Sequence, residues 1–415
     1  MTMPDTPPPL PPMAPTPVAR GERLQALDVL RGLALPGILL MNLEAFTGGL
    51  MQSMTGLDPA LRGADRVVDA LVLVFVQGKF YPLFALLFGM GFAVMAQRAR
   101  ALPPSTFTAV YARRLAALAV IGLLHTLLLW SGDILLGYAL VGVLLLALQG
   151  APTRALPGIA ALSLAFALGL WLALGALLAL AQGMGVDDAS APTLAGTLAA
   201  EQALIRDGTW AAALQARIAD LGLMLVGLPL LVGIVLAMFL LGRWAVERQL
   251  IAGAMPRVMA WMRWGALPAG LALTLGSLSL APHIDPLSPT MRETVAEAMR
   301  MLGGVLQCLG YVAWVLRALE VPALARVLGV FAPAGRMALT LYLMQSLVCT
   351  WLVSGYGLGL ADALARAWHP AFVLGLVGLQ VAFAHAWFAR YRFGPMEWLW
   401  RWATYGVRPP MRAGA

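Results

Sequence analysis

One histidine stands inside a long apolar stretch of the sequence, and its side chain is the first candidate for chemistry. The residues between Arg114 and His125 are all apolar, and Asp133 follows after a short turn that contains Ser and Gly. An imidazole can exchange protons near neutral pH, and a carboxylate or a water molecule can hold it in one orientation. We therefore expect His125 to act as a base with Asp133 as its orienting group. The alternative is a histidine that only forms a hydrogen bond with a neighbouring helix.

Three further polar groups interrupt apolar stretches. Lys79 lies in an interruption at residues 77–82 that contains Gly and Pro, which predicts a broken or re-entrant helix leading into the next span. Asn42 and Glu44 lie roughly 16 to 20 Å along a helix axis from Arg31, so we expect them near the outer end of the first span. An ionisable group in hydrocarbon costs roughly 3 kcal/mol, so such groups usually line a cavity or form pairs. For Lys79, the alternative is a side chain that extends to the lipid–water boundary.

Polar residues near the ends of the apolar stretches could bind a substrate. Asp28 and Arg31 are three residues apart and share one helix face, which predicts an ion pair at the inner membrane boundary. Gln345, Gln380 and His385 are expected to form hydrogen bonds between helices. The candidate substrate-binding residues are Asp28, Arg31, Glu44, Arg113, Arg114, Arg336 and Gln345.

The composition predicts which elements position these residues. Over 415 residues the hydrophobic share is 60% and the charged share 12%, roughly half the charged share of a soluble domain. Apolar runs close to the length of a membrane span recur along the chain, and they are continuous rather than alternating, which favours helices over a barrel. We predict an all-α, polytopic membrane bundle of about ten helices. The runs are 27–45, 80–96, 115–130, 134–148, 156–181, 221–241, 258–280, 298–316, 337–353 and 371–388.

The distribution of charge predicts the orientation of the bundle. Arginines gather beside every second loop, as the positive-inside rule requires, whereas the long loop at 182–220 is acidic. We therefore expect both termini in the cytoplasm, the 182–220 loop outside, and a multi-pass protein of the bacterial inner membrane. His283 and His369 are expected to be solvated in outer loops. The net charge of +8 then faces anionic headgroups, so no nucleic-acid partner is needed to explain it.

The chain divides into three predicted regions. Residues 1–22 are rich in Pro and predict a disordered cytoplasmic tail, residues 23–389 form the bundle, and residues 390–415 form a Trp- and Arg-rich cytoplasmic tail that lies at the membrane interface. Cys308 and Cys349 both fall in apolar spans and give neither a disulfide framework nor the spacing of a metal site. We expect no metal.

Several blocks, in the same order, resemble the YeiB family of bacterial membrane proteins. The resemblance runs from about Arg23 to Tyr405, and its blocks are 27–42, 79–91, 125–135, 339–346 and 394–401. The first span is also similar to that of the transmembrane acyltransferases, which pass an acyl group from cytoplasmic acyl-CoA to an acceptor on the far side of the membrane.

The first span departs from the acyltransferase patterns at their histidines. One acyltransferase group carries Arg, ten residues and His in this span, and here Arg31 matches while Asn42 stands at the histidine position. A second group carries Asn there and its histidine eleven residues later, where this chain has Ser53. Acyl transfer in this chain therefore requires His125 to take the histidine's role.

Three functions remain open. The first is an acyltransferase-like enzyme with acyl-CoA as the donor and a small-molecule, glycan or lipid acceptor. In that enzyme His125 is the base or acyl relay, Asp133 orients it, and Asn42 and Lys79 polarise the acyl carbonyl, while Arg31 with Arg113 or Arg114 lies near the donor phosphates. The second is a transporter or flippase for a small metabolite or lipid. The third is a non-catalytic protein that binds membrane lipids; the sequence does not indicate an oligomeric state.

Overall fold

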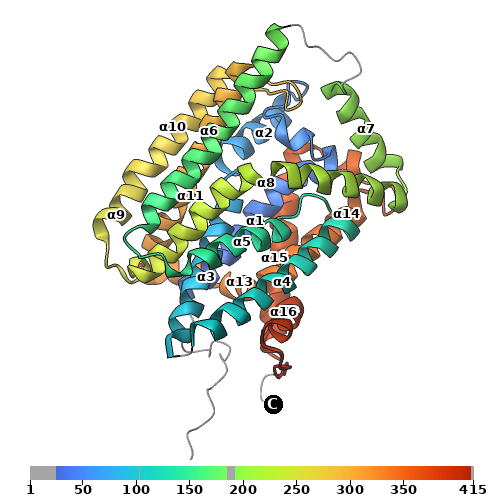
Figure 1. Ribbon diagram of the computed structural model, residues 1–415. Helices are drawn as coiled ribbons and strands as arrows, with labels where there is room; N and C mark the ends of the chain where they lie inside the picture. The colour runs from blue at the N-terminus through green and yellow to red at the C-terminus, as the bar shows by residue number, and fades with distance from the viewer. Residues whose placement is uncertain (1–24, 102, 185–191, 413–415) are drawn as a thin grey trace, which may run out of the picture.

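The structure is a computed structural model that describes residues 25–101, 103–184 and 192–412, and these residues form helices and loops without a β-strand (Figure 1). Within them, seven helical stretches are long and apolar enough to cross a membrane. The predicted all-α membrane bundle is therefore confirmed. The seven are α1 (Gln25–Gly48), α2 and α3 together (Gly63–Phe75 and Phe80–Arg98), α4 (Pro104–Leu128), α6 (Leu156–Gly183), α8 (Trp210–Glu247), α11 (Met291–Leu319) and α15 (His369–Phe388).

The other three predicted spans fall on shorter or interrupted helices. Helices α5 (Leu135–Ala147) and α14 (Ala338–Val353) are apolar but short. The third consists of α9 (Pro256–Trp261) and α10 (Leu267–Leu280), joined by a π-helical turn at Met262–Ala266. Pro268 lies in the first turn of α10, and because proline has no N–H, the helix widens just before it.

The predicted break at Lys79 is confirmed. Helix α2 ends at Phe75, Gly78 adopts a positive φ of 78°, and α3 begins at Phe80. The turn packs tightly on α11, since a Cβ atom on Gly304 would lie 2.5 Å from the carbonyl oxygen of Gly78.

Close helix crossings hold the bundle together. A Cβ atom on Gly89 of α3 would lie 2.0 Å from the carbonyl oxygen of Phe239 in α8, and small residues of this kind let membrane helices approach. The same holds where α1 crosses α13 (Ala332–Arg336): a Cβ atom on Gly335 would lie 1.8 Å from the carbonyl oxygen of Asp28. One cluster of buried apolar side chains lies between α3, α4, α5, α8 and α11, and a second lies between α1, α13, α14 and α15.

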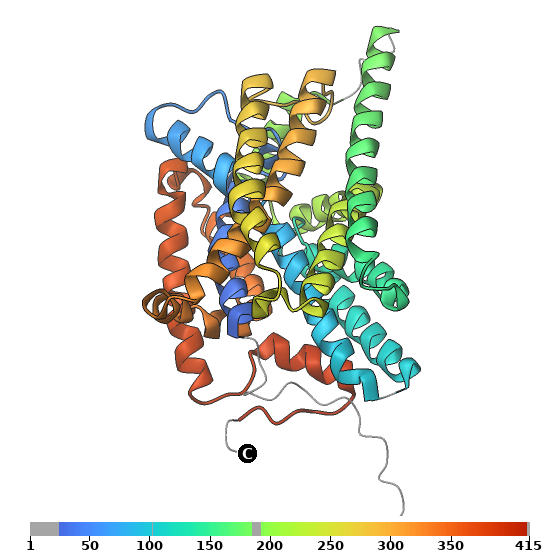
Figure 2. The same ribbon diagram turned by 90° about the vertical axis from the view of Figure 1, so that its left-hand side faces the viewer.

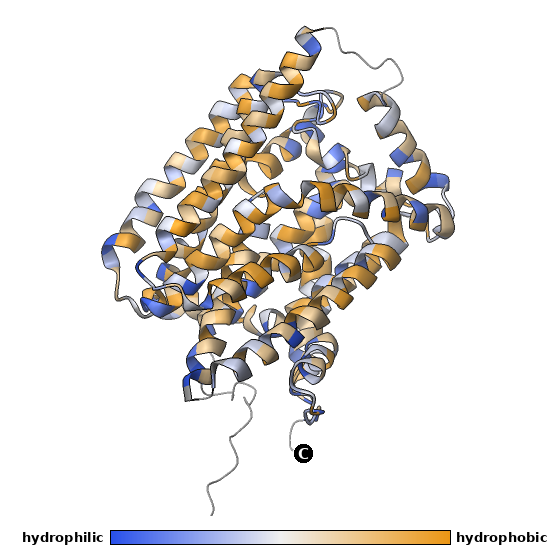
Figure 3. Cartoon of the chain, in the orientation of Figure 1, coloured by the Kyte–Doolittle hydropathy of each residue, from blue (hydrophilic) through white to orange (hydrophobic). Residues whose placement is uncertain are grey.

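Several loops and short helices lie at two opposite ends of the bundle (Figures 1 and 2). At one end are the α3–α4 turn and α16 (Pro395–Tyr405), which we call the arginine-rich end. At the other, which we call the α7 end, are α2, α7 (Leu194–Asp207) and the C-terminal end of α6. Hydrophilic residues concentrate at both ends, and apolar residues dominate the helices between them (Figure 3). The predicted orientation, with one end of the bundle in the cytoplasm and the other outside, requires hydrophilic residues at two opposite ends.

Two predicted regions differ from the described chain or lie outside it. The predicted outer loop at 182–220 contains α7 and the first turns of α8, which begins at Trp210. The predicted Pro-rich tail at 1–22 lies outside the described residues. A further short helix, α12 (Pro322–Gly329), precedes α13.

Candidate functional site

His125 and Asp133 form a buried pair where α4 ends and α5 begins. Nδ1 of His125 lies 2.8 Å from Oδ1 of Asp133, and the two side chains are 1% and 0% exposed. The other carboxylate oxygen accepts a hydrogen bond from the Leu136 N–H at 2.8 Å. Because an ionised carboxylate only accepts hydrogen bonds, Nδ1 donates and the lone pair of a neutral ring lies on Nε2. This buried Nε2 has no hydrogen-bond partner among the described residues.

A glycine makes the pair possible. Gly122 precedes His125 by about one helical turn, and a Cβ atom there would lie 2.4 Å from the Leu136 nitrogen and 2.9 Å from Oδ2 of Asp133. Any larger residue would push the start of α5 away from α4. The contact that the sequence left open between His125 and Asp133 is therefore fixed by the α4–α5 packing.

Helix α14 places further polar side chains at the level of the pair. The Tyr342 ring lies 5.2 Å from the His125 ring, measured between centroids. One turn later, Gln345 donates to Oε1 of Gln380 at 2.9 Å, which confirms the predicted hydrogen bond between helices. Within the described chain, Oε1 of Gln345 and Oγ1 of Thr126 are buried without a hydrogen bond. Buried polar atoms of this kind usually bind water or a ligand.

An arginine that the sequence did not single out closes the end of α4. Arg217, in α8, donates from NH1 to the Leu128 carbonyl oxygen at 3.2 Å and from NH2 to the Tyr356 hydroxyl at 2.6 Å, and it is only 7% exposed. A cation at a helix C-terminus satisfies carbonyl groups that have no partner within the helix. Arg217 therefore fixes the last turn of the helix that carries His125.

Asn42 belongs to a segment that contacts the His125 segment, but no described contact joins it to the pair. The rings of Phe46 and Trp130 lie 4.4 Å apart between centroids and are tilted by 33°. Asn42 precedes Phe46 by one turn of α1, and His125 precedes Trp130 by a little more than one turn. The Asn42 side chain is 8% exposed.

No described contact joins Lys79 to the histidine pair. Its Nζ donates to the carbonyl oxygen of Leu73 at 2.7 Å, in the last turn of α2, and the residue is 2% exposed. Lys79 therefore caps α2 rather than extending to the membrane boundary. The hypothesis that it polarises the same carbonyl as His125 has no contact to support it.

A polar pocket of about 190 Å³ opens at the α7 end and contains a buried ion network. NH2 of Arg366 lies 2.8 Å from Oε2 of Glu44 and 2.8 Å from Oδ1 of Asp69. NH1 of Arg366 lies 3.3 Å from Nδ1 of His369. The prediction that His369 is solvated is wrong: it is 2% exposed, because α15 begins there and its first turn packs beside Arg366. We call this the Arg366 pocket.

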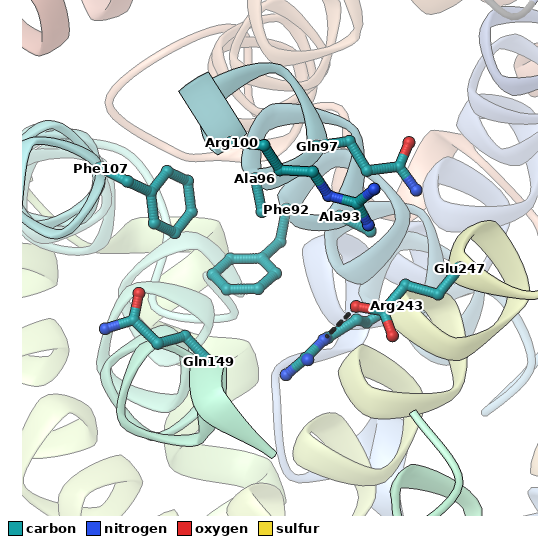
Figure 4. Close-up of a pocket in the computed structure, with 9 residues that line it drawn as sticks. All are labelled: Phe92, Ala93, Ala96, Gln97, Arg100, Phe107, Gln149, Arg243 and Glu247. Carbon is teal, nitrogen blue, oxygen red and sulfur yellow. Dashed lines mark hydrogen bonds and ion pairs between the residues drawn. The ribbon is translucent and has the colours of Figure 1, made fainter. Parts of the chain in front are cut away.

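A second pocket, of about 250 Å³, lies at the arginine-rich end (Figure 4). The Phe92 and Phe107 rings lie on one side of it, and the guanidinium groups of Arg100 and Arg243 lie on the other. Nε of Arg243 lies 2.7 Å from Oε1 of Glu247. We call this the Arg100 pocket, and the sequence analysis did not select any of its residues as a site.

The predicted arginine candidates mostly have other partners. Arg31 pairs with Asp28 at 3.1 Å, which confirms the predicted ion pair. The guanidinium of Arg114 lies 3.7 Å from the Trp400 ring centroid. Arg113 is exposed, and Arg336 lies 3.8 Å from the Phe388 ring centroid. These cation–π contacts hold α4 against α16 and α13 against α15.

Helix α16 contacts both α4 and α14, the helices that carry His125 and Gln345. The Trp400 indole donates to the Arg114 carbonyl oxygen in α4 at 2.8 Å. Glu397 accepts hydrogen bonds from the backbone N–H of Leu339 at 2.7 Å and from the Thr340 hydroxyl at 2.6 Å, at the start of α14. Burial raises the pKa of the Glu397 carboxyl above its usual range. The tail predicted to lie at the membrane interface thus contains a helix that braces α4 against α14.

Within the described residues, no group of three or more His, Cys, Asp or Glu side chains could hold a metal ion. The described side chains offer proton transfer at His125 and ion pairing in the two pockets.

Comparisons with known proteins give the family context. Residues 251–407 match the family model described as "Protein of unknown function (DUF418)". The chain is 32% identical to "Uncharacterized protein YxaH" of Bacillus subtilis, over 94% of this chain and 96% of the relative. It is 33% identical to "Uncharacterized protein YeiB" of Escherichia coli, over 94% of this chain and 98% of the relative.

Proposed function

The chain belongs to the YeiB family of membrane proteins, and from this premise we propose that it is an acyltransferase-like membrane enzyme. The donor is a cytoplasmic acyl-CoA, and the acceptor is a hydroxyl or amine that reaches the protein at its α7 end. His125 is the base, and Asp133 holds its orientation.

One observation carries the proposal. The Nδ1 atom of His125 is held by a carboxylate at 2.8 Å, while its Nε2 atom is buried and has no partner among the described residues. A histidine that served only packing would be expected to use both nitrogens, because a buried polar atom without a hydrogen bond costs about 1 to 3 kcal/mol. The pair therefore has the arrangement of a base whose reacting nitrogen is available.

The chemistry balances with this one base. Nε2 of His125 takes the proton of the acceptor as its oxygen or nitrogen attacks the thioester carbonyl. The carbon–sulfur bond breaks, and the thiolate of the donor receives the proton from the imidazolium. Asp133 stabilises that imidazolium while it exists. The products are an ester or amide and free coenzyme A.

The two pockets suit the two substrates. The Arg366 pocket combines charged side chains with the amides of Gln52 and Gln202, which can hydrogen-bond the hydroxyl or amino groups of an acceptor. The Arg100 pocket lies at the end that the arginine distribution predicts to be cytoplasmic, where an acyl-CoA would arrive.

The test uses purified protein in detergent with radiolabelled acetyl-CoA and a mixture of candidate hydroxyl and amine acceptors. The variant His125→Ala is expected to lose turnover by about 10²- to 10⁴-fold, the usual contribution of a general base. The matched control is His385→Ala, whose side chain is exposed and bonds only the Val330 carbonyl oxygen among the described residues. Equal turnover in wild type and His125→Ala rules the assignment out.

A transporter is the second candidate, because one bundle carries polar pockets at two opposite ends. Uptake of a labelled solute into proteoliposomes, without cleavage of any acyl donor, supports transport. Cleavage that depends on His125 supports the enzyme.

A further inference from the structure

The Arg100 pocket has the features of a ligand site that the described contacts leave available. Its guanidinium reaches into the pocket opposite the two phenylalanine rings (Figure 4). Within the described chain, the Arg100 side chain has no hydrogen bond or ion pair, although it lies beside several polar groups. An arginine held near a pocket without a partner is suited to a carboxylate or a phosphate.

The second arginine of the pocket is a fixed charge. Arg243 is 5% exposed, and besides its ion pair with Glu247 it donates to the carbonyl oxygens of Leu148 and Ala151 at 2.7 and 2.8 Å. These bonds hold its guanidinium in place whether or not a ligand binds. Since Glu247 balances the charge of Arg243, the net positive charge of the pocket is that of Arg100.

The remaining walls favour a phosphate attached to an organic group. The side-chain amides of Gln97 and Gln149 line the pocket. Gln149 uses one N–H group to donate to the Thr108 hydroxyl at 3.1 Å, which leaves its second N–H and the amide of Gln97 to donate to phosphate oxygens. The Phe92 and Phe107 rings, 5.4 Å apart between centroids, provide an apolar wall on the other side. A site that combines a cation and amides with aromatic carbon fits a phosphate together with a flat base better than a free inorganic anion.

The arginines that the sequence favoured for this task are engaged elsewhere. Arg31 is paired with Asp28, and Arg114 lies against the Trp400 ring. Arg113 is exposed and lies outside the pocket. Arg100 is exposed as well, but of these arginines only Arg100 lines the pocket.

We propose that the Arg100 pocket binds the phosphate-bearing nucleotide end of the donor, with Arg100 as the principal phosphate contact. This inference rests on the proposed function, because that function supplies a donor with a nucleotide end. The same phosphate chemistry also occurs in an anionic lipid headgroup, so the test separates the two sources.

The first arm of the test measures binding of coenzyme A to the full chain in detergent by isothermal titration calorimetry. Arg100→Ala is expected to weaken binding by about tenfold or more, the loss of one charge-assisted hydrogen bond, and Arg100→Lys to fall between. Arg390→Ala removes an exposed positive charge at the same end and is the matched control. An equal loss in Arg390→Ala, or none in Arg100→Ala, overturns the proposal.

The second arm identifies the part of the ligand that is recognised. Adenosine 3′,5′-bisphosphate is expected to compete with coenzyme A, whereas adenosine is not. The same titrations are made in nanodiscs of phosphatidylcholine alone and of phosphatidylcholine with phosphatidylglycerol. If Arg100→Ala lowers only the retention of phosphatidylglycerol and leaves coenzyme A binding unchanged, the pocket is a lipid site and the nucleotide assignment is wrong.

His125→Ala separates this inference from the proposed function. It is expected to bind coenzyme A as tightly as the wild type, because His125 does not line the pocket. If coenzyme A binds in a way that depends on Arg100 but the wild type shows no turnover, the pocket assignment stands and the enzyme proposal is wrong. If Arg100→Ala turns over with an unchanged KM for the donor, the pocket assignment is wrong and the enzyme proposal stands.

Discussion

The variant Asp133→Asn distinguishes the roles of the two hydrogen bonds that the Asp133 carboxylate accepts. One oxygen accepts from Nδ1 of His125 and the other from the Leu136 N–H, each at 2.8 Å. Asparagine has one acceptor oxygen and one amide group. If its oxygen keeps the Leu136 contact, its NH₂ group faces Nδ1, and the proton of a neutral imidazole moves to Nε2.

The expected size of the effect follows from that change. The variant loses a charge-assisted hydrogen bond of about 1.5 to 3 kcal/mol, and its reacting nitrogen carries a proton instead of a lone pair. Asp133→Asn is therefore expected to lower acetyl-CoA turnover by about 10²- to 10⁴-fold. The binding of coenzyme A is expected to stay unchanged, since the pair does not line the Arg100 pocket.

Two measurements check the reasoning. Turnover is compared with that of Asp207→Asn, which changes an exposed aspartate at the end of α7 and is expected to behave as the wild type. Nitrogen-15 NMR of labelled histidine reports which ring nitrogen of His125 is protonated. The His125→Ala spectrum assigns the signal among the four histidines of the chain. An unchanged tautomer together with unchanged turnover in Asp133→Asn refutes the orienting role.

Three further predictions concern stability. Gly335→Ala is expected to lower the thermal midpoint in detergent by a margin equivalent to about 1 to 3 kcal/mol, because its Cβ atom would lie 1.8 Å from a backbone oxygen of α1. Arg217→Met is expected to lower the free energy of unfolding by about 3 kcal/mol, because the Leu128 carbonyl oxygen at the end of α4 loses its hydrogen bond. Burial raises the pKa of Glu201 in α7 to about 7, so the folded state binds this proton more tightly than the unfolded state. The free energy of unfolding therefore falls as the pH rises from about 4.5 to about 7. Glu201→Gln is expected to remove this fall, and thermal unfolding midpoints measured across this pH range test it.

Matched variants define what contradicts each of these expectations. Gly329→Ala adds a Cβ atom whose nearest neighbour is 3.8 Å away, so equal midpoints for the two alanine variants contradict the packing argument. Arg206→Met removes an arginine side chain that is 51% exposed, and it is expected to cost far less than Arg217→Met. Glu320→Gln changes an exposed carboxylate and is expected to keep the pH dependence; a dependence that persists in Glu201→Gln contradicts its assignment.

Local spacing predicted the parts of the structure that depend on neighbours in the sequence. The three-residue spacing of Asp28 and Arg31 predicted their ion pair, and the Gly and Pro residues around Lys79 predicted the break between α2 and α3. Apolar length predicted the helical bundle, although two of the runs form short helices and one is interrupted before a proline. These features depend on helix geometry alone.

The ion network at the α7 end could not be predicted in the same way. Arg366 meets Asp69 and Glu44 across separations of 297 and 322 residues, and no local pattern reports such a contact. His369 follows Arg366 by three residues beside a proline, a context typical of an exposed loop, and only the packing of α15 buries it. The sequence analysis did not select the Arg100 pocket for a different reason. The positive-inside rule accounted for all the arginines at this end, so it gave no ground for choosing one of them as a binding residue.

Transfer of the acyl group across the membrane is the central claim, and sealed proteoliposomes test it most directly. Labelled acetyl-CoA is supplied only on the side of the arginine-rich end, and a membrane-impermeant acceptor mixture only on the side of the α7 end. Acetylated acceptor is predicted to accumulate on the α7 side with the wild type and to be absent with His125→Ala. Product that forms equally with His125→Ala, or no product with the wild type, would contradict the account.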